Sequence, residues 1–194
     1  MLNFLIVLFA INLIYVSVAD RFRIYSRLIA VQGILLMGIA LIELQEVSTL
    51  NLILILAETL IFKAIVVPYL LFSIIHRTGI YKVHNRALPG FFSLILTIIA
   101  LVLSIVIANL LENPHIDTAY LTIALFTMFV GVLLIIGHKL IFSHMIGFLI
   151  IENAVFMLSM AVGKEMTMLI NIGILLDVFA VSYTHLTLPT IYSV

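Results

Sequence analysis

Long apolar runs separated by short polar segments constrain this chain more than any other feature. A membrane-spanning helix needs about 20 mostly apolar residues to cross a hydrocarbon core of roughly 30 Å. The composition agrees, since 65% of the 194 residues are hydrophobic and only 9% are charged, whereas soluble domains are about half apolar and a quarter charged. The candidate spans lie near residues 2–19, 28–42, 50–75, 90–111, 118–137, 141–162 and 166–181.

Backbone groups in hydrocarbon must be hydrogen-bonded within the protein, which leaves helices and closed barrels as spanning structures. None of the runs alternates with the two-residue period of a barrel strand. We therefore predict an all-α fold, a polytopic integral membrane helix bundle with about seven transmembrane helices. We expect a four-helix region over residues 1–112 and a three-helix region over residues 113–181.

Basic residues are distributed unevenly between the loops, which predicts the orientation. The first, third and fifth loops hold seven of them and the even-numbered loops hold one. Those in the odd loops are Arg21, Arg23, Arg27, Arg77, Lys82, Arg86 and Lys139, and Lys164 lies in the sixth loop. We expect the odd loops in the cytoplasm and the N-terminus outside, in the cell inner membrane.

Residues 182–194, SYTHLTLPTIYSV, differ from the rest of the chain in being polar and rich in threonine. They follow only about sixteen residues of the seventh span, too few to cross a bilayer. They resemble a translated sequencing-adapter read-through, so we expect a non-native tail after a truncated seventh span. The alternative is a short polar C-terminus after a tilted helix.

Several classes of function find no support in the sequence. The net charge is zero and cysteine is absent, so we expect no nucleic acid partner, no iron–sulfur ligation and no thiol nucleophile. No phosphate loop or nucleophile elbow is present. His138 and His144 flank the fifth loop without a third ligand, and we expect solvated side chains there rather than a metal site. We predict no catalytic centre, cofactor or metal in this chain.

Two acids interrupt the last two spans. Glu152 and Asp177 each lie about eleven residues into a span, hence about 16 Å deep on neighbouring antiparallel helices. A low-dielectric environment disfavours an ionised carboxyl, so such a group can load and release a proton near physiological pH. This layout favours a proton relay, with Asn153 orienting a carboxylate. Gly147 and Gly173 would allow close helix approach. The alternative is that both acids are neutral and only hold helices together.

The third span contains a second pair of charges, Glu58 and Lys63. They are five residues apart, a poor match to the spacing that brings helical side chains together. Lys63 is too deep to reach water easily and needs a carboxylate or a hydrated cavity. Pro68 removes the backbone hydrogen bond to Ala64 and should kink the helix just after Lys63. The alternative is a static salt bridge from Lys63 to another helix.

The segments IGFLIIENAVFML, INIGILLDVFAV and FKAIVVPYLL resemble the hydrogenase 4 component E family of formate hydrogenlyase-type complexes. The last three spans also resemble the K-type membrane subunit of respiratory complex I, which carries one intramembrane glutamate on each of two successive helices. Counted from Gly147, the first acid comes about one turn later here, and the second is aspartate. The resemblance implies that Glu152 and Asp177 are the corresponding acids of a lateral proton path and Lys63 a further polar station. We also predict Glu58 as part of the proton relay.

The resemblance further implies a non-catalytic membrane-arm subunit of a hydrogenase-type complex. Its partners would be antiporter-like and other membrane subunits, with soluble nickel–iron and iron–sulfur subunits on the cytoplasmic side, and lipid around it. Proton or sodium movement would be coupled to redox chemistry in those partners. Two other functions stay open, an anchoring subunit without an ion path and a stand-alone secondary transporter. The transporter is the weaker of these, because no paired broken helices are evident.

Overall fold

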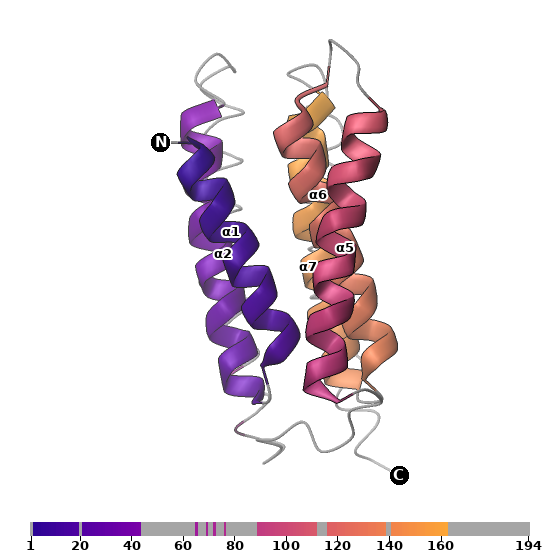
Figure 1. Ribbon diagram of the computed structural model, residues 1–194. Helices are drawn as coiled ribbons and strands as arrows, with labels where there is room; N and C mark the ends of the chain where they lie inside the picture. Colours follow the sequence, from indigo (N-terminus) through magenta and orange to yellow (C-terminus); the bar gives the residue numbers. More distant parts are fainter. Residues whose placement is uncertain are drawn as a thin grey trace.

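The computed structural model describes residues 2–19, 21–43, 89–111, 116–138 and 141–162, and the single residues Ile65, Tyr69, Phe72 and His76. These ranges are helical apart from their short connections, and the helices lie side by side along one direction (Figure 1). The helices are α1 (Leu2–Val18), α2 (Phe22–Glu43), α5 (Gly90–Leu110), α6 (Thr118–Gly137) and α7 (Ile141–Val162).

Four helices are long and apolar enough to cross a membrane, and α1 is an apolar helix of 17 residues. The four membrane-length segments are Arg23–Glu43, Gly90–Leu110, Thr118–Gly137 and Ser143–Val162. The described part of the chain is thus all-helical, and its apolar helices are those of a membrane-embedded protein. The count of seven helices stays a prediction, because residues 166–181 and most of residues 50–75 lie outside the described ranges.

The predicted bounds of α1, α5, α6 and α7 agree with the structure within a residue, whereas α2 begins six residues before the predicted start at residue 28. We expected residues 20–27 to form a loop because three arginines lie among them. In the structure Arg23 and Arg27 belong to α2, with exposed side chains. Long basic side chains can reach the polar boundary from within a helix, so they need not end it.

The helices form two groups, α1 with α2 and α5 with α6 and α7 (Figure 1). The closest pair is α6 and α7, which run antiparallel along their whole length, while α1 also contacts α5 and α6. The face of α5 toward its neighbours consists of small residues, Thr97, Ala100, Ser104 and Ala108, and its opposite face is apolar and exposed. Apolar exposure of this kind suits contact with lipid.

Polar contacts join the helix ends. Asp117 caps α6, its Oδ1 accepting from the backbone N–H groups of Ala119 at 2.8 Å and Tyr120 at 3.2 Å. The hydroxyl of Tyr120 donates to Oε2 of Glu43, at the end of α2, over 3.1 Å. At the opposite end the Ser93 hydroxyl donates to the carbonyl of Ser17. Such bonds satisfy groups that helix termini leave open.

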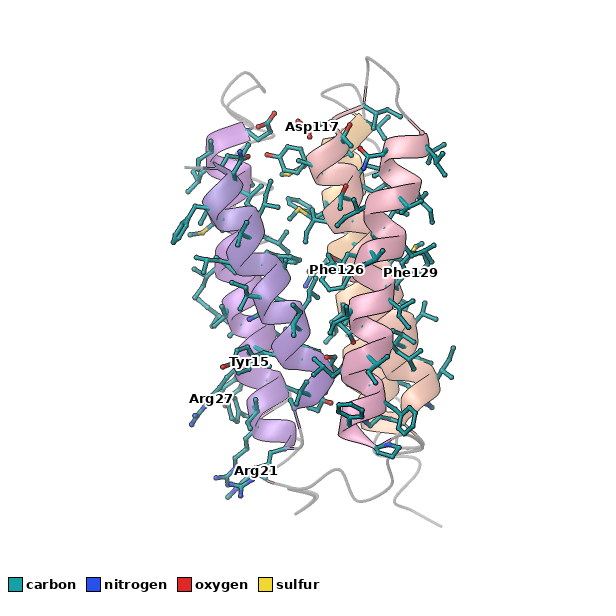
Figure 2. All side chains as sticks on the ribbon, in the orientation of Figure 1. Tyr15, Arg21, Arg27, Asp117, Phe126 and Phe129 are labelled. Atoms are coloured by element: carbon teal, nitrogen blue, oxygen red, sulfur yellow. The ribbon has the colours of Figure 1, made fainter. Side chains whose placement is uncertain are left out.

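Basic and acidic side chains at the helix termini lie at opposite ends of the helices. Arg21 and Arg27 lie at one end of the helices and Asp117 at the other (Figure 2). Glu43 lies at the same end as Asp117, because it bonds Tyr120 in the first turn of α6. The basic end is the end at which α2 begins, and the acidic end is the end at which α2 ends and α6 begins.

Candidate functional site

Glu152 lies at the middle of α7. It follows Ile141 by eleven residues and precedes Val162 by ten, which places it about 15 Å from either end of the helix. Its side chain is 7% exposed. An acidic side chain at this depth costs at least about 2.5 kcal/mol on insertion scales, so burial within the protein is the expected arrangement.

Close packing against α6 fixes one face of α7. A Cβ built on Gly147 would lie 2.5 Å from Cγ1 of Ile135 and 2.8 Å from the carbonyl oxygen of Gly131. A Cβ on Gly131 would lie 2.9 Å from the carbonyl oxygen of Gly147. Neither glycine can carry a side chain at this separation, so each lets the other helix approach. We expected Gly147 to serve the approach of the seventh span, but its open side is occupied by α6.

A second face of α7 meets α2 through two buried amides. Nδ2 of Asn153 donates to Oε1 of Gln32 over 3.1 Å. Gln32 is fully buried and Asn153 is 4% exposed. Gln32 lies ten residues into α2 and Asn153 twelve residues into α7, so the bond lies near half depth. The prediction that Asn153 orients a carboxylate stays a prediction, and its amide nitrogen is engaged with Gln32.

A third buried amide, Asn12 of α1, lies one turn away from this bond. Its Nδ2 donates to the carbonyl of Leu28 over 3.3 Å, and Leu28 precedes Gln32 by four residues on the same face of α2. Among the described residues, Oδ1 of Asn12 and Nε2 of Gln32 have no hydrogen-bond partner. Buried amides of α1, α2 and α7 therefore lie within about one helical turn of one another, near the level of Glu152.

The other predicted site residues, Asp177, Lys63, Glu58 and Pro68, lie outside the described residues, as does Gly173. The pairing of Glu152 with Asp177 and the kink after Lys63 stay predictions. The structure thus places Glu152 and Asn153 among the predicted residues, on adjacent positions of one buried helix.

The prediction of a solvated His138 is wrong, because this side chain is only 6% exposed. Its Nδ1 lies 3.0 Å from the carbonyl of Leu134, and its ring meets that of Tyr25 edge-on at 6.5 Å between centroids. His144 is exposed as predicted, with Nε2 2.8 Å from the carbonyl of His138. Within the described ranges no group of three or more His, Cys, Asp or Glu side chains is placed to hold a metal ion.

Three residues of this site were not singled out from the sequence, Gln32, Asn12 and Gly131. A single glutamine inside an apolar span is a visible signal, since a buried amide needs a partner. Gly131 carries no comparable signal, because its role depends on which helix packs against it. In comparisons with known proteins, no family model, no curated protein and no solved structure matches the chain.

Proposed function

We propose that this chain is a non-catalytic membrane-arm subunit of a hydrogenase-type complex, in which Glu152 exchanges protons as part of a lateral path. Asp177 and Lys63 would be further stations, within a bundle of about seven helices whose N-terminus faces outward from the cell membrane. Partner subunits would carry the redox chemistry and the rest of the ion path. The type of complex rests on the sequence resemblance, and the proton role rests on Glu152.

The observation that carries the proposal is the burial of Glu152 halfway along a membrane-length helix. A carboxyl is costly at this depth, and intramembrane acids commonly belong to ion pathways. Low dielectric disfavours the ionised form, so a carboxyl there can alternate between neutral and charged states when a proton donor is near. Buried amides on three helices at this level provide polar surroundings that hydrocarbon alone does not offer.

A second function, a purely anchoring subunit, is favoured by the same polar contacts. The bond between Gln32 and Asn153 joins α2 to α7, and the contact between Gly131 and Gly147 joins α6 to α7. Hydrogen bonds and close packing of small residues hold membrane helices together. In that case Glu152 would only stabilise the bundle and would not need to exchange a proton.

The test is Glu152→Gln in the intact complex, reconstituted in vesicles, with protons moved per electron and complex yield both measured. Glutamine keeps the size and hydrogen-bonding capacity of the side chain and removes the ionisable group. A proton path predicts normal yield with reduced translocation, whereas an anchoring role predicts lower yield with an unchanged ratio. Asp117→Asn is the matched control, because it neutralises an acid at the helix end and retains an N-cap.

A further inference from the structure

The bond between Gln32 and Asn153 joins two helices that otherwise touch little. Contact between α2 and α7 is limited, in contrast to the long contact between α6 and α7. Both amides are buried, with 3.1 Å between donor and acceptor. A buried amide that loses its partner is costly, so this bond strongly favours one relative position of α2 and α7.

The position of Asn153 on α7 also determines where Glu152 points. Successive residues of an α-helix are rotated by about 100° about its axis. Measured from Gly147, which faces α6, Glu152 lies about 140° around the axis in one direction and Asn153 about 120° in the other. Thus α7 has three faces, one toward α6, one toward α2 and one that bears Glu152. A rotation of α7 that moves Asn153 moves Glu152 through the same angle.

We propose that Gln32 is a positioning residue for Glu152, acting through Asn153 to fix the rotation of α7 at half depth. This inference rests on the proposed function of Glu152 and adds a residue from α2 to the site. Among the described residues, Nε2 of Gln32 has no hydrogen-bond partner. A buried amide N–H without an acceptor costs free energy. If Gln32 and Asn153 served only to pack the helices, apolar residues of similar size would do so without this cost.

The experiment measures the reactivity of Glu152 in the full chain, reconstituted in lipid vesicles. Dicyclohexylcarbodiimide enters hydrocarbon and converts a protonated carboxyl to a stable N-acylurea, which mass spectrometry locates on the Glu152 peptide. The rate is measured across pH for the native chain and for Gln32→Met, which retains the side-chain length but removes the acceptor. A swap variant, Gln32→Asn with Asn153→Gln, exchanges the two amides and can restore the bond.

In Gln32→Met, rotation of α7 should change the polar contacts of the Glu152 carboxyl. A change equal to one hydrogen bond at that carboxyl moves the pH of half-maximal labelling by about half a unit or more. The swap variant should return the profile toward the native one. Ser104→Ala is the control, because the Ser104 hydroxyl donates to the carbonyl of Ala100 within α5, and it should leave the profile unchanged. A native labelling profile in Gln32→Met would overturn the inference.

If Gln32→Met does not fold, Asn153→Leu tests the same link from the α7 side. A shifted profile in folded Asn153→Leu supports the inference, and a native profile overturns it. Failure of the inference differs from failure of the proposed function. If Glu152→Gln lowers proton translocation while Gln32→Met labels like the native chain, only the role of Gln32 is lost. If Glu152→Gln leaves translocation intact, the proton path is lost whatever the labelling shows.

Discussion

The close approach of α6 and α7 predicts that Gly131→Ala destabilises the protein. The added Cβ would lie 2.6 Å from Cγ1 of Ile151, 2.9 Å from the carbonyl oxygen of Gly147 and 3.2 Å from the nitrogen of Ile151, where ordinary contact begins at 3.4 Å. Two of these atoms are backbone and the third is the branch of a stiff side chain. The substitution therefore forces the helices apart by about half an ångström.

The change in the free energy of unfolding depends on effects of opposite sign. Overpacking of this kind costs about 1–3 kcal/mol, and separating the helices also weakens dispersion contacts along the pair. Alanine favours a helix over glycine by about 1 kcal/mol. We expect Gly131→Ala to lower the free energy of unfolding by up to about 2 kcal/mol.

Gly137→Ala is the matched control on the same helix. A Cβ there would meet nothing within 4 Å, so only the helix-favouring effect operates. We expect Gly137→Ala to be as stable as the native chain or more stable by up to about 1 kcal/mol.

The assay is unfolding of the purified full chain in mixed micelles by increasing dodecyl sulfate, followed by far-ultraviolet circular dichroism. We expect Gly131→Ala to unfold at a clearly lower detergent fraction than Gly137→Ala. Gly147→Ala should behave like Gly131→Ala, and the double variant should cost less than both together, because the helices have already separated. Equal stability of Gly131→Ala and Gly137→Ala would refute the close contact.

The helix-end contacts give two further predictions. Asp117→Ala should lower the free energy of unfolding by about 1 kcal/mol through loss of the α6 cap, while Asp117→Asn should retain most of the capping effect. Dodecyl sulfate unfolding measures both variants, and equal losses would exclude a capping role. Tyr120→Phe should cost about 1 kcal/mol by removing the hydroxyl that bonds Glu43. Tyr15→Phe, at a side chain 64% exposed, should leave the unfolding curve unchanged, and a similar loss there would contradict the role given to the Tyr120 bond.

Much of the described fold could be predicted because membrane helices depend on length and apolarity, both of which are local in sequence. The bounds of α1, α5, α6 and α7 follow from apolar runs ended by polar segments. The start of α2 could not be predicted in this way, because arginines at a membrane boundary are compatible with either a loop or a helix. His138 is buried next to Tyr25 of another helix, a contact that no local sequence pattern indicates.

The candidate site, like the fold, could be predicted from the sequence only in part. Glu152 was recognisable from one acid within an apolar run, and its half depth followed from counting residues. Its surroundings were not recognisable, because the partner of Asn153 is 121 positions away in the chain. The pairing of Gly147 with Gly131 likewise depends on which helices become neighbours. The pairing of Glu152 with Asp177 stays a prediction of the sequence.

The proposed proton path requires that water can reach Glu152 in the protein interior at half depth, and that its side chain does not face lipid. The chain has no cysteine, so Glu152→Cys introduces a single thiol whose reaction with a small, charged methanethiosulfonate reports access from water. Ile99→Cys is the comparison, because Ile99 lies midway along α5 and is 55% exposed on its apolar face. We expect the thiol at position 152 to react in vesicles and the thiol at position 99 to stay unreactive. An inert thiol at position 152, or equal reaction at both positions, would contradict the proposed proton path.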